Sequence, residues 1–292
     1  MVTIGFIGAG RVGTSLALLL CRQDYRVSAV YSRSPDSSRK LAEGIKGCHI
    51  FADIQGVADN SELVFITTPD DAIATIADSV KWQPGQMVVH CSGADSTDIL
   101  ASSRKAGALT GVFHPLQTFA STEQALENIS GSTFAIEALE PLLGNLKKMT
   151  YDLGGSWIEI KAEDKAIYHI AAVFTCNYLV TLMKIATDLW QTFGISPLQS
   201  AQALLPLVKG TVNNIETIGL LDCLTGPIAR GDTGTITKHI SALNKKAPHL
   251  IATYKELALK TIPIALEKGG INKSQASALE AILTKEPGQG HN

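Results

Sequence analysis

Three side chains in the middle of the chain, His114, Lys165 and His169, have the chemistry of acid–base catalysts. Imidazole groups titrate near neutral pH and an ammonium group donates protons, so both suit proton transfer to a reacting atom. Lys165 and His169 stand four residues apart and therefore share one face of a helix. We predict Lys165, His169 and His114 as catalytic residues that give a developing alkoxide a proton or a positive charge. The alternative is that Lys165 extends to water at the helix start, while His169 and, further along the helix, Asn177 are core polar residues with their own partners.

Three further polar residues could orient a substrate: Gln117, Asn177 and Arg230. Gln117 follows closely on His114, and Asn177 lies about 80° round the helix from the face that carries the histidine. Arg230 belongs to the glycine-rich stretch LTGPIARGD, where a guanidinium could offer paired donors to a carboxylate. An ordinary helix connector with a surface ion pair is the alternative for that stretch. We predict all three as substrate-binding residues.

A glycine-rich turn, GAGRVG, follows an apolar run at the start of the chain and precedes an apolar helical stretch. In the order strand, turn and helix, Gly8 permits a tight turn, Gly10 lets a pyrophosphate approach the backbone, and Gly13 lets the helix pack on the strand. The free N–H groups of the helix N-terminus then attract phosphate. We predict that Gly8, Gly10, Arg11, Val12 and Gly13 bind a dinucleotide. A tight turn without a ligand is the alternative.

The residues after the second expected strand indicate which nicotinamide cofactor is preferred. An NAD site carries Asp or Glu about 20 residues beyond the glycines, where it accepts hydrogen bonds from the ribose 2′-OH. This chain has Ser32, Arg33 and Ser34 there. A guanidinium between two hydroxyls can pair with a 2′-phosphate, so we predict NADP as the cofactor and these three residues, with added charge from Arg11, as its ligands. A solvated surface arginine is the alternative.

Polar or turn-forming residues also follow three later strands. The segments are Thr67–Asp70, His90–Ala94 and His114–Thr118. Ligands of open α/β sheets bind beyond the carboxyl ends of the strands, so we predict Thr68, Pro69 and Ser92 as cofactor contacts. Pro69 equally suits the start of a helix. His90 is either a catalytic residue or a strand histidine that the backbone satisfies.

Short apolar runs and amphipathic helical stretches alternate up to about Ile160 and must position these groups. This alternation predicts an α/β fold class, with βαβ units on a doubly wound, largely parallel sheet that forms a Rossmann domain over residues 1–160. Helical stretches alone follow, so residues 161–292 are predicted to form an all-helical domain for substrate binding and dimerisation. The expected strands are Thr3–Ile7, Val27–Tyr31, Leu63–Thr67, Met87–Cys91, Leu109–Phe113, Thr133–Ile136 and Trp157–Ile160. The expected helices are Arg11–Arg22, Ser37–Ile45, Asp71–Val80, Thr97–Ala106, Ala138–Met149, Ala162–Phe193, Pro197–Ile218, Thr233–Ala247, Pro248–Lys268 and Lys273–Lys285.

Composition excludes several classes of function. The 292-residue chain has 25 Lys and Arg against 27 Asp and Glu, a net charge of −2, and it lacks a basic block, so we expect no nucleic-acid partner. Its five cysteines are far apart without a Cys-x-x-Cys pair, and we predict neither a metal site nor a disulfide framework. The first residues run straight into a strand, with no export signal, which predicts a cytoplasmic protein.

One apolar stretch requires a test for membrane insertion. From Ala166 to Met183 no residue carries a fixed charge, and the length approaches that of a spanning helix. His169, Thr175 and Asn177 interrupt the stretch, and no second hydrophobic segment supports it, so we predict no membrane span. We expect instead a helix that is buried on all sides, at the centre of a domain or of a homodimer.

Several of these motifs together resemble the β-hydroxyacid and 6-phosphogluconate dehydrogenase superfamily, whose members join an N-terminal Rossmann domain to an all-helical domain. The motifs are GAGRVG, HCSGA, HPLQTF, YHIAAVFTCNY and TGPIARGD. More narrowly, the chain is similar to a family of oxidoreductases whose C-terminal helical domain has no assigned function. The superfamily's helix often carries a catalytic Lys followed four residues later by Asn. Lys165 matches that pattern, whereas His169 replaces the Asn.

The resemblance and the predicted cofactor together imply an NADP-dependent oxidoreductase that transfers hydride to a small carbonyl or imine substrate. Arg230 suits a substrate with a carboxylate, and a 2-oxo acid of the ketopantoate type is the specific expectation. The cofactor would carry the hydride, while the protein supplies orientation, a proton donor and charge stabilisation. The alternative is a non-catalytic NADP-binding sensor or binding module.

Overall fold

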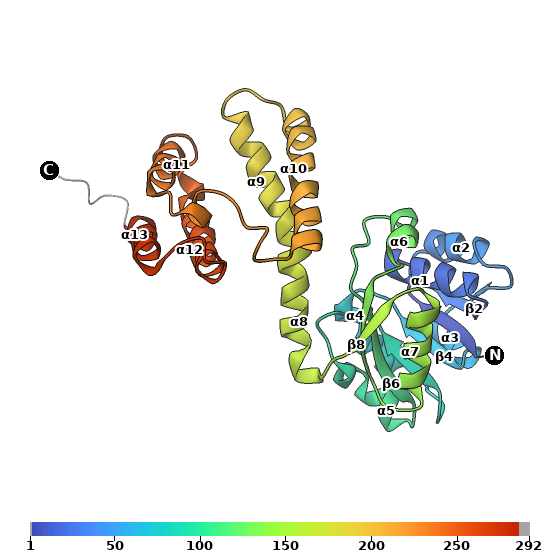
Figure 1. Ribbon diagram of the computed structural model, residues 1–292. Helices are drawn as coiled ribbons and strands as arrows, with labels where there is room; N and C mark the ends of the chain where they lie inside the picture. The colour runs from blue at the N-terminus through green and yellow to red at the C-terminus, as the bar shows by residue number, and fades with distance from the viewer. Residues whose placement is uncertain (1, 286–292) are drawn as a thin grey trace. The chain divides into compact units, whose positions relative to one another are not determined.

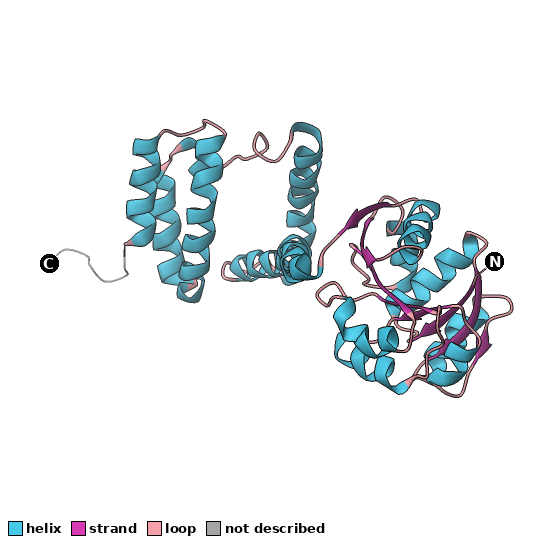
Figure 2. Ribbon diagram, turned by 90° about the horizontal axis from the view of Figure 1, so that it is seen from below, coloured by secondary structure: helices cyan, strands magenta, loops and turns pink. Residues whose placement is uncertain are grey.

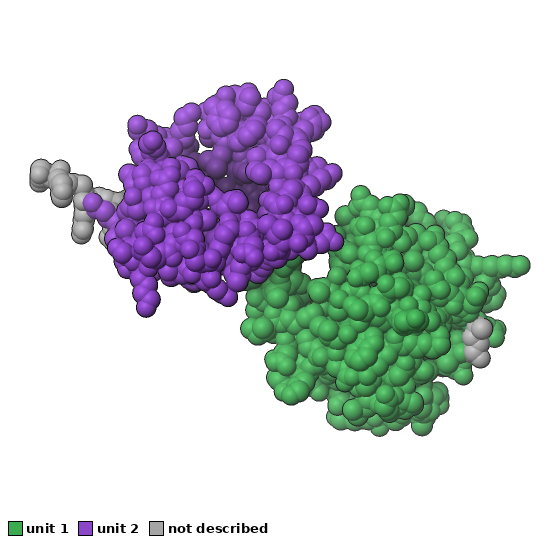
Figure 3. All heavy atoms as spheres, in the orientation of Figure 1, with its two compact units in different colours: residues 1–178 green, residues 179–292 purple. Residues whose placement is uncertain are grey.

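The structure is a computed structural model that describes residues 2–285. The chain divides into two compact units, the first ending at Tyr178 and the second beginning at Leu179 (Figure 3). The sequence also predicts a disordered tail over Glu286–Asn292, and this segment lies outside the described residues. The change from mixed to all-helical structure follows Glu159, so the first unit also contains the first helix of the predicted helical domain.

The first unit is built on an eight-stranded sheet with the strand order β3-β2-β1-β4-β5-β6-β7-β8 (Figures 1 and 2). Its strands are β1 (Thr3–Ile7), β2 (Arg26–Tyr31), β3 (His49–Ile50), β4 (Leu63–Ile66), β5 (Met87–His90), β6 (Leu109–Pro115), β7 (Thr133–Ala138) and β8 (Ser156–Glu159). Neighbouring strands are parallel except for β6 and β7, which are antiparallel. The chain order reverses between β1 and β4, as in a doubly wound fold, so the predicted fold class is confirmed.

Apolar side chains form a core on each face of this sheet. Phe6 belongs to one cluster and the next residue, Ile7, to the other, because successive side chains of a strand point to opposite faces. The rings of Phe6, Phe65, Phe113 and Phe134 follow one another across the first face, with centroids 5.1, 6.0 and 4.6 Å apart. The helices are α1 (Arg11–Arg22), α2 (Pro35–Glu43), α3 (Ile54–Asp59), α4 (Asp70–Ser79), α5 (Ala101–Lys105), α6 (Thr122–Asn128), α7 (Leu142–Asp152) and α8 (Lys165–Ala172). Helices α1, α2 and α7 pack on the first face of the sheet, and α3 and α4 pack on the second. Both faces of the strands that carry the site are therefore covered.

The structure differs from the sequence prediction in short elements and at helix starts. It contains β3, α3 and α6, which are too short to show a periodic apolar pattern. The predicted start of a helix at Ser37 is wrong, since α2 begins at Pro35, where the Ser34 hydroxyl accepts a hydrogen bond from the Ser37 N–H. The expected helix start at Ala138 is also wrong, because β7 continues through that residue.

After the sheet, the chain runs through α8, a π-helical turn (Val173–Asn177) and α9 (Tyr178–Gln191). Among the described residues, Ala162–Gln191 is the one helical stretch long and apolar enough to cross a membrane, judged by length and composition alone. The prediction that this helix is buried on all sides is wrong for the single chain, where Ile167 is 70% exposed and Phe174 is 64% exposed. The first unit, which contains Ile167 and Phe174, therefore does not bury these side chains by itself.

In the second unit, the last three helices share a core. These helices, α11 (Thr233–Lys246), α12 (Ile251–Glu267) and α13 (Lys273–Thr284), pack around Ile236, Ile262 and Leu279. By contrast, Ser200 is the one buried residue of α10 (Pro197–Ile218). The exposed apolar side chains of α10 are Leu198, Leu205, Leu207, Val212, Ile215 and Ile218.

Candidate active site

The glycine turn between β1 and α1 has space where a phosphate would approach. Gly8 has a φ of 106°, and a Cβ there would lie 2.8 Å from the backbone of Thr67. A Cβ on Gly13 would lie 2.3 Å from the Thr67 Oγ1 atom, whereas a Cβ on Gly10 would meet nothing within 4 Å. No side chain caps the N-terminus of α1, and its first turn has no acidic residue. The turn is therefore tightly packed on the protein side and open where free N–H groups can bind an anion.

Of the three residues after β2, Ser32 and Ser34 form hydrogen bonds with the backbone, whereas Arg33 is an exposed cation. The Ser34 hydroxyl caps α2, and the Ser32 hydroxyl accepts a hydrogen bond of 3.4 Å from the Ser34 N–H. Arg33 is exposed at the same strand end as the glycine turn, since β1 and β2 are parallel neighbours. An anionic ribose substituent would thus meet a cation there and no carboxylate in the sequence Ser32-Arg33-Ser34.

The polar groups that follow β4 and β5 differ, because the Thr68 hydroxyl has no hydrogen-bond partner among the described residues whereas the Ser92 hydroxyl contacts two carboxylates. The Thr68 Oγ1 atom is buried without a hydrogen-bond partner among the described residues, as expected for a group that faces a ligand. Pro69 is the N-cap residue of α4. The Ser92 hydroxyl lies 2.9 Å from an Asp70 carboxylate oxygen and 3.0 Å from one of Asp95, so it also organises its own loop.

Lys165 is buried, with 1% of its surface exposed, and its ammonium donates a hydrogen bond of 2.9 Å to the Ser92 carbonyl oxygen. Burial lowers the pKa of Lys165 to about 8, although the carboxylates of Glu137, Asp95 and Asp70 act in the opposite direction. The ammonium is therefore charged at neutral pH but close to titration. The alternative that Lys165 extends into water is excluded by this burial.

Two imidazoles converge on the backbone of Gly93, just beyond β5. A Cβ on Gly93 would lie 2.6 Å from His169 Nδ1 and 2.9 Å from His114 Nε2. His114 Nδ1 forms a 2.8 Å hydrogen bond with the Tyr168 hydroxyl, whereas His169 Nδ1 is buried without a partner among the described residues. Burial, together with the positive charge of Lys165, lowers the pKa of His114 to about 3, so this imidazole is neutral at physiological pH.

A cavity of about 520 Å³ lies against this cluster. Its lining includes His114, Gln117, Tyr168, His169 and Asn177, so four of the six residues predicted for catalysis or substrate binding border one space. The Gln117 amide nitrogen also donates to the Asn128 carbonyl oxygen, which fixes its orientation. No acidic side chain lines this cavity within residues 2–285.

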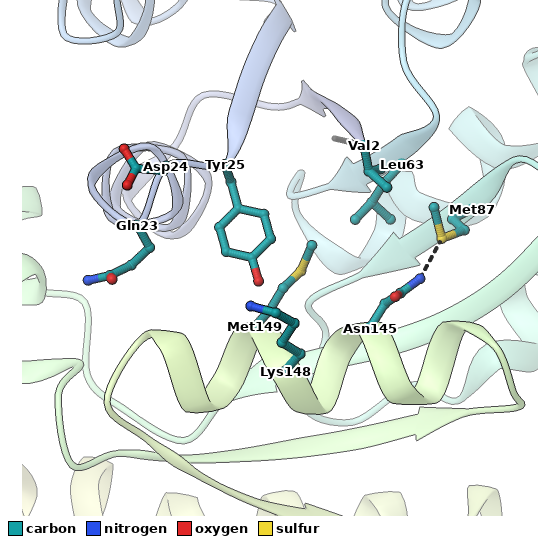
Figure 4. Close-up of a pocket in the computed structure, with 9 residues that line it drawn as sticks. All are labelled: Val2, Gln23, Asp24, Tyr25, Leu63, Met87, Asn145, Lys148 and Met149. Carbon is teal, nitrogen blue, oxygen red and sulfur yellow. Dashed lines mark hydrogen bonds between the residues drawn. The ribbon is translucent and has the colours of Figure 1, made fainter.

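A second cavity, of about 310 Å³, lies at the opposite end of the parallel strands, where their amino ends are (Figure 4). It is lined by Val2, Leu63 and Met87, which stand at the amino ends of β1, β4 and β5. Two of its polar groups have a partner nearby, because the Tyr25 hydroxyl donates to the Asp152 carboxylate, which Lys148 also contacts. Ligands of parallel sheets bind at the carboxyl ends, so the 520 Å³ cavity is the candidate site.

The sequence prediction missed three residues of the cluster: Gly93, Glu137 and Tyr168. Tyr168 stands three residues after Lys165, a spacing that itself places the two on one helix face. Glu137 is an acidic residue in an otherwise apolar strand, and its Oε1 atom accepts a 2.6 Å hydrogen bond from the Thr97 hydroxyl. The spacing of Tyr168 from Lys165 and the acidic residue Glu137 in an apolar strand can both be recognised in the sequence. The approach of two imidazole rings to Gly93 depends on tertiary packing.

Other sequence candidates have different surroundings. His90 is fully buried, with Nε2 3.1 Å from the Ser96 carbonyl oxygen and Nδ1 accepting from the Ser92 N–H, so the backbone satisfies it. Arg230 is exposed in the second unit, within a 3₁₀ turn that ends at Gly231. Among the described residues, no group of three or more His, Cys, Asp or Glu could hold a metal ion.

Two segments of the chain match models of known protein families. Residues 1–115 match the Rossmann-like domain, and residues 132–261 match a domain of unknown function, DUF2520. No curated protein matches the chain. The order of the two matches, a Rossmann-like domain before DUF2520, confirms the resemblance to a family whose C-terminal helical domain has no assigned function.

Solved structures share this architecture over most of the chain. A candidate NADP oxidoreductase of Bacteroides fragilis is 26% identical, with a TM-score of 0.73 over 89% of this chain and 97% of its own. A Thermotoga maritima protein is 27% identical, with a TM-score of 0.73 over 91% and 99% of the two chains. A pyrroline carboxylate reductase of Plasmodium falciparum, solved with NADP bound, is 16% identical, with a TM-score of 0.62 over 94% and 98%, and shows the shared fold.

Proposed function

We propose that this protein is an NADP-dependent oxidoreductase that reduces a small carbonyl or imine compound carrying a carboxylate, such as a 2-oxo acid of the ketopantoate type. One observation carries the proposal. A cavity beyond the carboxyl ends of the strands, the same ends that the open glycine turn follows, is lined by His114, Tyr168 and His169, with the buried cation Lys165 beside it. The candidate NADP oxidoreductase of Bacteroides fragilis with the same architecture supports it.

The residues around the glycine turn fit a dinucleotide. Gly8, Gly10 and Gly13, with the N-terminus of α1 at Arg11 and Val12, would hold the pyrophosphate, and Thr68, Pro69 and Ser92 would border the nicotinamide half. Arg33 between Ser32 and Ser34 would pair with the 2′-phosphate of NADP. When bound, the reduced nicotinamide supplies a hydride to the substrate.

The cluster at the cavity would serve the charge that develops on the substrate. A carbonyl oxygen becomes an alkoxide as the hydride arrives, and it requires a proton donor or a cation nearby. His114 and His169 would donate hydrogen bonds to this oxygen, and Lys165 would add positive charge. Gln117 and Asn177 would orient the substrate, and Arg230 would bind its carboxylate.

We also propose a homodimer in the cytoplasm. The exposed apolar side chains of α10, among them Leu207 at 68% and Ile218 at 55%, form a surface that a second copy of the chain would cover. The five cysteines are free, as suits a reducing compartment.

Catalysis is distinguished from the alternative, a non-catalytic NADP sensor, by turnover. The test incubates the purified protein with NADPH and a panel of 2-oxo acids, ketones and cyclic imines, and follows the loss of NADPH absorbance. We expect consumption with at least one oxo acid. Tight NADPH binding without consumption across the whole panel would favour the sensor.

A further inference from the structure

The buried Lys165 does not reach the cavity where a substrate would bind. Its side chain is 1% exposed, its ammonium donates to the Ser92 carbonyl oxygen, and it is not among the residues that line the 520 Å³ cavity. The ammonium lies 5.9 Å from the centre of the Tyr168 ring. A proton donor that touches the substrate must therefore come from another residue of the cluster.

His114 and Tyr168 both line that cavity and are hydrogen-bonded to each other at 2.8 Å. A phenol is a stronger acid than a neutral imidazole N–H, and an imidazole nitrogen accepts more strongly than a phenol oxygen, so the Tyr168 hydroxyl donates to His114 Nδ1. The remaining imidazole proton then resides on Nε2. This nitrogen is the one beside Gly93, where a Cβ would lie 2.9 Å from it.

We propose, building on the reductase function above, that Tyr168 holds neutral His114 with its proton on Nε2, and that this N–H protonates the substrate carbonyl oxygen. His114 is then the catalytic residue, and Tyr168 is a positioning residue that also replaces the proton. Burial supports the neutral form of each partner, because it lowers the pKa of His114 to about 3 and raises the pKa of Tyr168 to about 12.

The proton and electron balance of this step closes with groups of the cluster. As the carbonyl carbon accepts the hydride that NADPH supplies, the π electron pair of the C=O bond moves to oxygen. The oxygen forms a bond to the Nε2 proton, and the Tyr168 hydroxyl proton moves to Nδ1, which leaves His114 neutral. The resulting phenolate of Tyr168 is stabilised by the positive charge of Lys165 nearby. It takes the Nδ1 proton back as solvent in the cavity protonates Nε2, which restores the starting tautomer of His114.

Tyr168→Phe tests this assignment because it removes one oxygen and keeps the ring. Nitrogen-15 NMR of the histidine side chains, with His114 assigned through His114→Gln, reports the tautomer without any substrate. We expect the wild type at neutral pH to carry the His114 proton on Nε2, and Tyr168→Phe to give a mixture of tautomers. With a substrate, kcat should fall on the order of 100-fold while KM and NADPH affinity are unchanged. Tyr151→Phe, at a tyrosine that is 80% exposed on α7, is the matched control and should change neither measurement.

The outcomes separate this proposal from the reductase function. A doubly protonated His114 at neutral pH, a proton on Nδ1 in the wild type, or an unchanged tautomer in Tyr168→Phe would overturn the assignment. Undiminished turnover by Tyr168→Phe would overturn it too, while the reductase function would stand. If no carbonyl compound is reduced at all, the reductase function fails, and with it the protonation step, whatever tautomer the spectra show.

Discussion

Replacing Gly93 with alanine should disassemble the active-site cluster while leaving the rest of the fold in place. The added Cβ would lie 2.6 Å from His169 Nδ1 and 2.9 Å from His114 Nε2, where ordinary contacts begin at 3.4 Å. The two rings would therefore have to move by 0.8 and 0.5 Å, the differences between 3.4 Å and those two distances. Gly93 is not among the glycines with positive φ, so alanine adds no backbone strain there.

The size of the effect follows from the displacement. Misplacing a catalytic group by about 1 Å can cost on the order of 100-fold in rate, so we expect Gly93→Ala to lower kcat by about that factor. Overpacking a core position typically costs about 1–3 kcal/mol, which a folded domain of this size tolerates. Gly93 follows β5, whereas the glycine turn that would hold the pyrophosphate follows β1, and β4 lies between these two strands. We therefore expect NADPH affinity to remain near that of the wild type.

The assay combines turnover of an identified substrate, NADPH titration by fluorescence and the melting temperature. Gly234→Ala on α11 is the matched control, because its Cβ would make an ordinary contact of 3.6 Å with the Asp232 carboxylate. This control should retain full turnover. A folded Gly93→Ala protein that turns over substrate at the wild-type rate would refute the reasoning, as would a crystal structure in which neither ring has moved.

Four further outcomes are expected. NADPH should bind more tightly than NADH, and Arg33→Ala should weaken NADPH binding about ten- to a hundredfold in fluorescence titrations; tighter NADH binding by the wild type would contradict this. Turnover should fall as the pH rises through about 8, because burial lowers the pKa of Lys165 to about 8 and its positive charge is lost above that value; a pH–rate profile that stays level into the alkaline range would exclude a role for that charge. Sedimentation at micromolar concentration should show a dimer that Leu207→Lys dissociates, whereas a 31.0 kDa wild-type monomer would argue against the exposed face of α10 as an interface. Arg230→Ala should raise KM for acidic substrates without changing kcat, and an unchanged KM would remove Arg230 from the substrate site.

The sequence predicts most of this fold because the elements that matter are long or strongly patterned. Each of the seven expected strands is present, and the boundaries of β1, α1 and α10 agree with the structure to the residue. The pattern fails where elements are too short to show a period, as in β3 and α3. It also fails for the burial of the helix after the sheet, because an apolar sequence shows that a surface needs a partner but not whether that partner lies in the same chain.

The candidate site is predictable only in part, for a different reason. Helix spacing joins Lys165 to His169, and a strand end exposes His114, so local rules identify these residues as candidates. The role of Gly93 arises from packing between α8 and the ends of β5 and β6, which no local pattern encodes. The orientation of Lys165 is likewise a tertiary property, since the same spacing would suit a side chain that reaches water.

The burial of Lys165 argues that the cluster exists for chemistry and not for stability. An apolar side chain of similar size, such as methionine, could fill the same volume without the cost of removing an ammonium from water. Instead the chain places the ammonium on the Ser92 carbonyl oxygen and surrounds it with the carboxylates of Glu137, Asp95 and Asp70, which partly offset the effect of burial on its pKa. Such an arrangement keeps a positive charge, with a pKa near the working pH, behind the neutral imidazole of His114 and the neutral phenol of Tyr168. No acidic side chain among the described residues lines the cavity that these two groups border. A site of this kind favours negative charge on a bound oxygen, and that is the charge a carbonyl acquires when it is reduced.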